Sequence, residues 1–230
     1  MRIVSWNCNM ALRRKLDLVL ELEPDVLVVQ ECAERDIAEA PARFAHWVGA
    51  NRHKGLGILG LADLGYALAE PVGDDLPWFL PVHLGVPGVN LVGVWACRRS
   101  SAFRYVRVSH AAVDRLGPFL RAAPTIAIGD FNSNAIWDGE HGDFCHSTLI
   151  ERLRVLGLES AYHRQAREPQ GAESQPTLFM YRDRRRPYHI DYALASTSLL
   201  SASSLRLGDP GRWLSASDHV PLVLDILPGG

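Results

Sequence analysis

Thr125-Ile126-Ala127-Ile128-Gly129-Asp130-Phe131-Asn132-Ser133-Asn134 is the stretch of sequence around which the chain is organised. Its apolar, partly β-branched start predicts a buried strand, and Gly129 ends that strand just before a carboxylate and two carboxamides. Alternation along an extended chain would turn Asp130 and Asn132 toward the same side. Because ligands bind at the carboxyl ends of strands in layered α/β proteins, this pair is a candidate for a functional site. The same residues are also typical of a turn rich in Asn, Asp and Gly, and the segment alone leaves both interpretations open.

The composition of the 230-residue chain is that of a soluble globular protein, and we expect one domain over residues 1–230. Its hydrophobic content is 47% and its charged content 22%, which excludes a disordered chain. The formal net charge of -2 argues against a broadly basic surface that coats nucleic acid, although a local basic groove stays open. The four cysteines lack CxxC spacing and indicate reduced thiols in a cytoplasmic protein. No apolar run is long enough for a signal peptide or a membrane span. We also expect the protein to be a monomer.

Apolar patterning predicts the remaining elements. Strands are expected at 2–6, 25–31, 54–60, 78–84, 90–97, 124–132, 177–181, 189–195, 203–207 and 221–226. Helices are expected at 11–22, 109–122 and 146–156. The glycines of 54–60 could cradle a phosphate, but neither a helix nor a Walker Lys-Ser/Thr pair follows them, so a strand is favoured. Strands outnumber helices, and several are apolar on both faces, which favours an α/β fold of two packed sheets with helices outside them.

Polar side chains recur at the ends of the predicted strands. Besides Asp130 and Asn132, they are Asn7 with Asn9, Glu31, Asp191, and Asp218 with His219. A buried carboxylate at a sheet end is costly unless it is paired, hydrogen-bonded or bound to a metal, so this recurrence predicts one shared site. Oxygen donors of this kind, without Cys or His at zinc spacing, suit a hard ion such as Mg²⁺ or Mn²⁺. Phosphate is the natural partner of such a site.

At these positions the sequence resembles the endonuclease/exonuclease/phosphatase superfamily, which includes abasic-site endonucleases, DNase I-like nucleases and inositol-polyphosphate phosphatases. The resemblance is carried by five short motifs that occur in the family's order between residues 5 and 219. They are Ser5-Trp6-Asn7, Gln30-Glu31, Gly129-Asp130-Phe131-Asn132, His189-Ile190-Asp191-Tyr192 and Ser217-Asp218-His219. The resemblance implies a four-layer α/β sandwich, in which two packed mixed β-sheets are flanked by helices and the site lies at one rim of the sheets.

The resemblance also implies a metal site. Glu31 would be the principal ligand of Mg²⁺ or Mn²⁺, with Asp218 and Asn7 nearby, and Asn7 would also belong to the catalytic group. Asn9 would also belong to the metal site, but it stands where many nucleases of the family carry Asp, so one anionic ligand is missing here. The metal would stabilise charge on the non-bridging and leaving oxygens of the phosphate as a Lewis acid.

The resemblance gives the other polar residues catalytic roles. Asp130 would orient or deprotonate the attacking water, and Asn132 would help to hold this water and the phosphoryl oxygens. Asp191 would pair with His219 and favour its imidazolium, which can stabilise the pentacovalent phosphorus. This division of labour needs neither a covalent nucleophile nor an organic cofactor.

Basic and aromatic residues near these motifs are candidates for substrate binding. They are Lys54, Trp95, Arg98, Arg182, Arg184, Arg185 and Tyr188. The basic run 182–186 can be a solvated hairpin tip, or it can grip a nucleic-acid backbone while Tyr188 stacks on a base. Trp95 stands where the family often has Tyr or His and cannot donate a phenolic hydrogen bond, so Arg98 or Arg99 could take over the phosphate contact. The alternative for Trp95 is an aromatic residue of the core.

We therefore predict a Mg²⁺- or Mn²⁺-dependent phosphoester hydrolase, a nuclease or phosphodiesterase that acts on nucleic acid by direct attack of an activated water. Two alternatives remain. One is a phosphatase of a small phosphorylated metabolite or lipid headgroup, and the other is a catalytically silent module that binds nucleic acid on the same fold. A zinc site formed by His141, Cys145 and His146 is disfavoured because their spacing fits no zinc motif, and His146 is better explained as a helix start.

Overall fold

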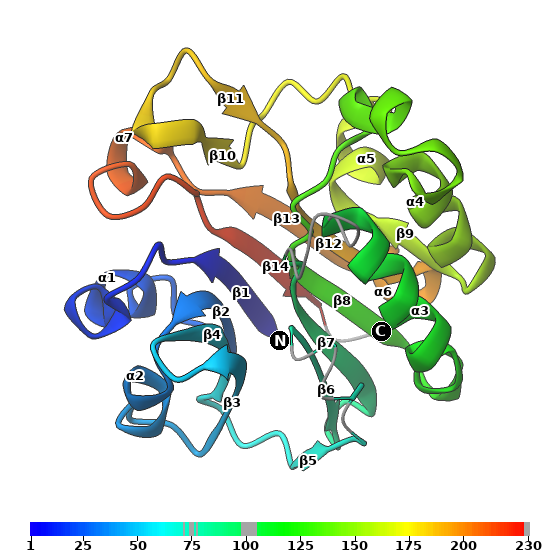
Figure 1. The fold of residues 1–230 in the computed structure, drawn as a ribbon. Helices are drawn as coiled ribbons and strands as arrows, with labels where there is room; N and C mark the ends of the chain where they lie inside the picture. The colour runs from blue at the N-terminus through cyan, green and yellow to red at the C-terminus, as the bar shows by residue number, and fades with distance from the viewer. Residues whose placement is uncertain (71, 74–75, 77, 98–104, 228–230) are drawn as a thin grey trace.

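The computed structural model describes residues 1–70, 72–73, 76, 78–97 and 105–227. Within them, two six-stranded β-sheets pack face to face (Figure 1). The first sheet contains, in spatial order, β13 (Ser203–Leu207), β14 (Leu222–Ile226), β1 (Arg2–Asn7), β2 (Val26–Cys32), β4 (Lys54–Gly60) and β3 (Phe44–Asn51). The second contains β5 (Tyr66–Leu68), β6 (Phe79–Leu84), β7 (Val89–Trp95), β8 (Thr125–Asp130), β12 (Asp191–Ser196) and β9 (Leu158–Ser160). Both sheets are mixed, because β1 pairs parallel with β2 and antiparallel with β14, and β8 pairs parallel with β7 and antiparallel with β12.

Helices form the outer layers. Over the first sheet lie η1 (Leu12–Arg14), α1 (Leu16–Leu20), α2 (Glu34–Ala38) and α7 (Pro210–Trp213). On the side of the second sheet are α3 (Tyr105–Ala122), η2 (Ala135–Glu140), η3 (Gly142–Phe144), α4 (His146–Val155), α5 (Ala161–Ala166) and α6 (Thr197–Leu200). A small hairpin of β10 (Leu178–Phe179) and β11 (Pro187–Tyr188), with η4 (Met180–Arg182) between its strands, projects beyond the sheets. The predicted α/β sandwich of two packed mixed sheets flanked by helices is confirmed.

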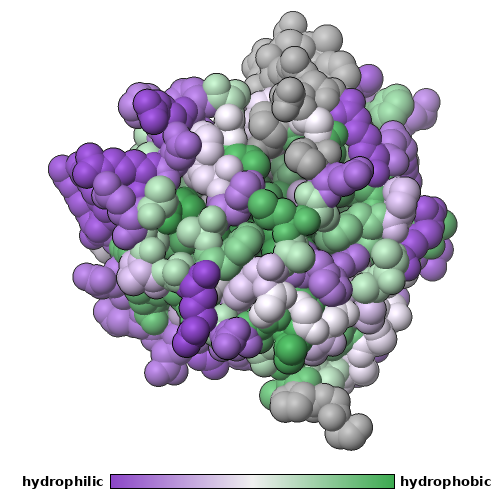
Figure 2. All heavy atoms as spheres, turned by 90° about the horizontal axis from the view of Figure 1, so that it is seen from below, coloured by the Kyte–Doolittle hydropathy of each residue, from purple (hydrophilic) through white to green (hydrophobic). Residues whose placement is uncertain are grey.

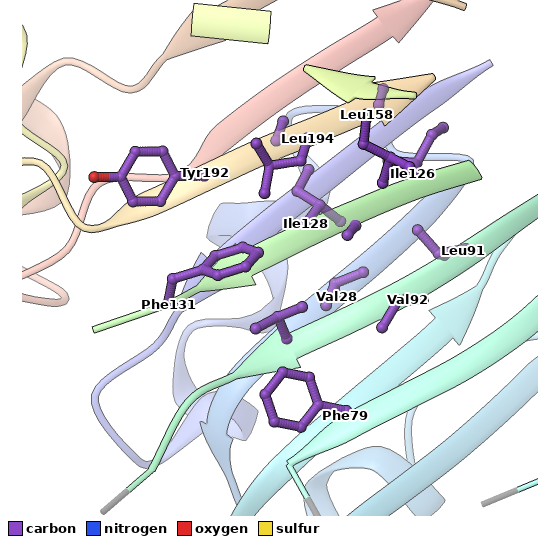
Figure 3. Close-up of a cluster of buried hydrophobic side chains, with 14 of the residues drawn as sticks. Val28, Phe79, Leu91, Val92, Ile126, Ile128, Phe131, Leu158, Tyr192 and Leu194 are labelled. Carbon is purple, nitrogen blue, oxygen red and sulfur yellow. The ribbon is translucent and has the colours of Figure 1, made fainter. Parts of the chain in front are cut away.

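Strand alternation explains the core between the sheets. In β1, Ile3 belongs to the cluster between the sheets, whereas Val4 and Trp6 belong to the cluster under α1, α2 and α7. Figure 3 shows part of the first cluster, in which Val28 of the first sheet packs with Ile128 of the second. The same alternation continues to the strand ends, so polar residues that share a face with these apolar ones point into the rim between the sheets.

Gly129 allows β8 to approach its neighbour closely just before Asp130. Its φ is 148°, and a Cβ at this position would collide with the carbonyl oxygen of Val94 in β7. A side chain here would therefore push apart the strands that carry the rim.

Several predicted elements differ in extent from the observed ones. The helix expected at 11–22 is split into η1 and α1, because Lys15 leaves the helical conformation and its ammonium binds the carbonyl oxygens of Cys8 and Asn9. The strand expected at 177–181 ends at Phe179, since Tyr181 and Arg182 adopt left-handed backbone conformations. The strand β3 and the helix α2 were not predicted, because their region is rich in Ala and charged residues and lacks a clear period. By contrast, the strand expected at 203–207 is observed with the same bounds.

The surface on the face seen in Figure 2 is mixed. Hydrophilic side chains gather at the side where α1 and α2 lie, and apolar atoms are scattered over the middle. Among the described residues, no helix is both long enough and apolar enough to cross a membrane.

Candidate active site

Asp130, at the end of β8, is the centre of the candidate site. Its side chain is buried, and Oδ2 accepts hydrogen bonds from Nδ2 of Asn7 at 2.9 Å and from Nδ2 of Asn132 at 3.0 Å. Asn7 comes from the other sheet, so this contact bridges the two sheets at their rim. Asn132 lies beside Asp130, but not through extended alternation: its φ is 48°, and its backbone N–H donates to Oδ1 of Asp130 at 2.9 Å. An Asx-type turn therefore brings the two side chains together.

A buried carboxylate–imidazole pair lies next to Asp130. Asp191 begins β12 directly opposite Asp130 in the β8–β12 register, and its Oδ2 accepts a hydrogen bond from Nδ1 of His219 at 2.8 Å. Two hydroxyl groups hold this pair through its backbone. Oγ1 of Thr177 accepts from the backbone N–H of Asp191, and Oγ of Ser217 accepts from that of His219. Ser217 belongs to the Ser217-Asp218-His219 motif and Thr177 lies 14 residues before Asp191, but nothing in the sequence signals their hydrogen bonds.

Burial and neighbouring charges set the protonation of these groups. Burial disfavours the charged imidazole of His219, but the charge of Asp191 and the hydrogen bond with it outweigh this effect and raise the pKa of His219 to about 10. Burial, reinforced by the charge of Asp191, raises the pKa of Asp130 to about 7. His219 is therefore an imidazolium at neutral pH, and Asp130 has the proton affinity of a general base.

Oxygen donors gather where β1 and β2 end. Glu31 has a φ of 61° and sits at an irregularity between Gln30 and Cys32 in the pairing of β2 with β4, which takes it out of the strand alternation. Nδ2 of Asn9 donates to Oδ1 of Asp218 at 2.9 Å, and the backbone N–H of Asn9 donates to Oδ1 of Asn7 at 3.1 Å. Carboxylate and amide oxygens of this kind are the donors that a hard divalent ion takes.

A second group also has the composition of a metal site. One ligand atom each of Asp130, Asp191 and His219 lies within 4.8 Å of the others, and in the described part of the chain no other trio of His, Cys, Asp or Glu is so arranged. However, Nδ1 of His219 already binds Asp191, and an imidazolium has no lone pair for a metal. This trio is better suited to hold and move protons, which leaves the oxygen donors around Glu31 as the better candidate for an ion.

The residues predicted to bind substrate fall into two groups. Lys54, Trp95 and Tyr188 lie at the rim: Nζ of Lys54 is 2.9 Å from Oε2 of Glu31, and the buried Trp95 pairs with Asp130 in the β7–β8 register. The second group, the arginines of the β10–β11 hairpin, either contacts other protein groups or is exposed to solvent.

Arg182 donates to the backbone carbonyls of Ser215 and Ala216 at 3.1 and 3.3 Å, so its guanidinium holds two loops together. Arg185 forms an ion pair with Asp183 at 2.8 Å, and Arg184 is exposed to solvent. Arg98 lies outside the described residues.

A cavity of about 510 Å³ adjoins Asn132. Its described lining includes the aromatic side chains of Tyr105, Trp137 and Tyr188, and the ring centres of Trp137 and Tyr188 are 5.4 Å apart. Trp137 was missed in the sequence because it lies in an irregular segment with no periodic pattern.

The residues considered for a zinc site serve other purposes. Nδ1 of His146 contacts Oγ of Ser133 at 2.9 Å, and Oδ1 of Asp138 accepts from the backbone N–H of His146 at 2.9 Å. Asp138 thereby caps the start of α4, which agrees with the interpretation of His146 as a helix start.

Comparison with known proteins places this geometry in context. Residues 4–219 match the sequence model of the Endonuclease/Exonuclease/phosphatase family. No curated protein sequence matches the chain. Among solved structures, a 3′ phosphatase from Neisseria bound to a product DNA hairpin has a TM-score of 0.76 at 21% identity, with 99% of this chain and 100% of that chain covered.

Two AP endonucleases have similar folds. The enzyme from Archaeoglobus fulgidus has a TM-score of 0.69 at 19% identity, with 98% of this chain and 99% of that chain covered. The enzyme from Leishmania major has a TM-score of 0.74 at 17% identity, with 99% of this chain and 88% of that chain covered. At such identities the likeness shows the fold, whereas the sequence match extends from β1 through His219. On that match, the chain belongs to the endonuclease/exonuclease/phosphatase family.

Proposed function

We propose that this protein is a divalent-metal-dependent phosphoester hydrolase that cleaves nucleic acid by direct attack of an activated water. The observation that carries the proposal is the buried arrangement at the rim, in which Asp130 is hydrogen-bonded to Asn7 across the sheets and lies beside the Asp191–His219 pair. The carboxylate of Asp130, whose pKa is raised, can serve as the base in the hydrolysis of a phosphoester. The neighbouring imidazolium of His219 can serve as the acid.

Mg²⁺ or Mn²⁺ would be held by Glu31, Asn7 and Asp218, with Asn9 beside them. The donor set consists of oxygens, which these hard ions prefer. A further observation supports a cation site here, because Glu31 already forms an ion pair with the ammonium of Lys54. When bound, the ion would supply Lewis-acid stabilisation of charge on the phosphate oxygens.

The side chains would divide the proton transfers between them. Asp130 would accept the proton of the attacking water, because a pKa of about 7 leaves much of it ionised at neutral pH and still basic enough to act. Asn7 and Asn132 would fix the orientation of its carboxylate. His219 would donate a hydrogen bond to a phosphoryl oxygen as negative charge develops, and Asp191 would keep it protonated and oriented.

The cavity beside Asn132 supports a nucleic-acid substrate. At about 510 Å³ it has space for more than a phosphate group, and its aromatic lining suits a nucleobase or sugar. Arg184 at the tip of the β10–β11 hairpin would add an exposed positive charge near the phosphate backbone of a bound nucleic acid. The likeness to a 3′ phosphatase bound to DNA makes a phosphomonoester at a DNA end the second candidate substrate.

The proposal is tested by hydrolysis assays with Mg²⁺, Mn²⁺ or excess chelator. Substrates are single-stranded DNA, duplex DNA with an abasic analogue, RNA, a 3′-phosphorylated DNA and small phosphomonoesters. We expect chelator-sensitive cleavage of a polynucleotide that is lost in Asp130→Asn and retained in Glu39→Gln, which changes an exposed carboxylate paired with Arg35. Release of phosphate only from DNA ends would favour the phosphatase, and turnover of small esters alone would refute nucleic-acid cleavage.

Salt dependence gives an independent measure. A protein that contacts several backbone phosphates loses affinity steeply as salt rises, since counterions are released on binding. A small ester should show a much weaker dependence. Metal-replete protein that binds polynucleotide with a steep salt slope, yet hydrolyses none of the substrates, would identify a silent binding module instead.

A further inference from the structure

Lys54 connects the two sheets at the rim of the candidate site. Its Nζ is 2.9 Å from Oε2 of Glu31 in the first sheet and 5.5 Å from the ring centre of Trp95 in the second. The side chain of Lys54 is 40% exposed and that of Glu31 is 20% exposed, so this ion pair remains open to solutes. One ammonium thus lies against a proposed metal ligand and against an aromatic wall of the site.

The backbone directs Lys54 to this place. It is the first residue of β4 and shares a face with Leu56 and Ile58, which both belong to the core between the sheets. Trp95 pairs with Asp130 in the β7–β8 register, so the ring under the ammonium belongs to the strand beside the proposed base. The ammonium therefore lies beside Glu31 of the proposed ion site and over a residue of the strand that neighbours the proposed base.

We propose that Lys54 is a tethered cation of the active site, which neutralises Glu31 until a divalent ion takes that carboxylate and then binds the phosphate of the substrate. The inference rests on the proposed function and adds a residue that acts in two successive contacts. A divalent ion at Glu31 repels an ammonium at the same carboxylate, which favours its release. The long, flexible stem of Lys54 and the attraction of the Trp95 ring keep the released ammonium in the site, where a phosphate oxygen is its strongest available acceptor.

A purely structural ion pair makes opposite predictions. If Lys54 only held Glu31 in position, its loss would disorder the ligand and weaken metal binding. If it competes with the ion, its loss strengthens metal binding and weakens substrate binding. The signs of these two effects separate the alternatives.

The first experiment titrates Mn²⁺ into substrate-free protein and measures free Mn²⁺ by electron paramagnetic resonance. Lys54→Met keeps an unbranched, flexible side chain one atom shorter than that of Lys and removes the charge, and we expect it to lower the Kd for Mn²⁺ by about three- to tenfold. The matched control is Arg52→Met, which removes a positive charge from the β3–β4 turn just before Lys54, where Arg52 pairs with Glu34 at 3.6 Å. This control should leave the Kd for Mn²⁺ unchanged.

An unchanged or weaker Kd in Lys54→Met would overturn the inference, and so would an equal gain in Arg52→Met, because the effect would then be one of general charge. Failure of the wild-type protein to bind Mn²⁺ would instead refute the proposed metal dependence, and the inference with it. These outcomes are distinct, because the titration needs no turnover.

The second experiment measures, at saturating Mn²⁺, the hydrolysis of the polynucleotide that the hydrolysis assays identify as the substrate. Lys54→Met should raise KM about tenfold, since a charge-assisted hydrogen bond to phosphate is lost. Lys54→Arg keeps the charge, so its KM should stay close to that of the wild-type protein. A KM that does not change in Lys54→Met would show that the ammonium does not reach the substrate, and would overturn the second half of the inference.

Discussion

Replacing Asp191 by Asn is the sharpest test of the buried pair that it forms with His219. The substitution keeps the size of the side chain and an oxygen that can accept from Nδ1, but it removes the negative charge. That charge is the main influence that raises the pKa of His219, and burial acts against it. In Asp191→Asn the pKa of His219 should therefore fall from about 10 toward its ordinary value of 6.5.

The size of the effect follows from these two pKa values. At pH 8, a pKa of about 10 keeps about 99% of His219 protonated, whereas a pKa of 6.5 leaves about 3%. If the imidazolium is required, this change alone lowers kcat/KM at pH 8 by about 30-fold. The charge of Asp191 also raises the pKa of Asp130, so its removal should lower that pKa as well. Both limbs of the pH–rate profile should then move to lower pH.

The assay measures kcat/KM for the substrate that the protein hydrolyses, from about pH 5 to about pH 10 at saturating metal. Circular dichroism verifies that the variant is folded. The wild-type rate should fall only as pH approaches about 10, where half of His219 is deprotonated, and the variant should lose activity above about pH 6.5. A uniformly lower rate with an unmoved alkaline limb would refute the reasoning, because the protonation of His219 would then not depend on Asp191.

Stability gives a readout that is independent of turnover. A folded-state pKa above the ordinary value means that the protonated His219 stabilises the native state fully below pH 6.5, and that this contribution is lost as pH rises through about 10. The free energy of unfolding of the wild-type protein should therefore fall between these pH values. In Asp191→Asn this fall should be much smaller.

Three further predictions concern other parts of the molecule. Glu31→Gln should lower metal-dependent turnover about 100-fold or more and weaken Mn²⁺ binding in a calorimetric titration, and wild-type affinity would remove Glu31 from the ligand set. Gly129→Ala should destabilise the fold by about 2 kcal/mol or more in urea unfolding, because the new methyl group meets the carbonyl oxygen of Val94; an unchanged midpoint would contradict this packing. Burial opposes ionisation of Glu173, but hydrogen bonds led by that of His163 lower its pKa to about 2, so its contribution is present above pH 4.5 and is lost as pH falls through about 2. Glu173→Gln should therefore be less stable than the wild-type protein at neutral pH, with the difference shrinking in acid; equal unfolding curves at neutral pH would exclude this role.

Strand alternation explains why much of the fold and site could be predicted from the sequence. Asn7 and Asp130 are the last residues of strands whose inward faces also carry Ile3 and Ile128, so a period of two places both in the rim. Asp191 follows the same rule from the other direction, as the first residue of β12. Such strands have a pattern that depends little on the rest of the chain.

Backbone conformations outside the regular pattern could not be predicted, even at residues that the sequence singles out for the site. Glu31 and Asn132 reach the site through left-handed conformations, which a periodic pattern does not encode for residues other than glycine. Arg182 illustrates the opposite case: a basic residue at the right place in the sequence is engaged by backbone carbonyls that only the tertiary structure brings near. Trp137 belongs to a segment without period, and its neighbour Tyr188 is distant in sequence.

Charge balance at the rim links the buried pair, the ion and Lys54. Among the described residues, the carboxylates of the site are Glu31, Asp130, Asp191 and Asp218, and the cations that contact them or the carbonyl groups of Cys8 and Asn9 are Lys54, His219 and Lys15. With all of these groups ionised, four negative charges face three positive ones, and one net negative charge remains. A divalent ion and the single negative charge of a phosphodiester then bring the site to neutrality, which lowers the cost of burying these groups. An Asp in place of Asn9 would leave an excess negative charge, so the amide at this position fits a site in which Lys54 stays close to the ion and the substrate.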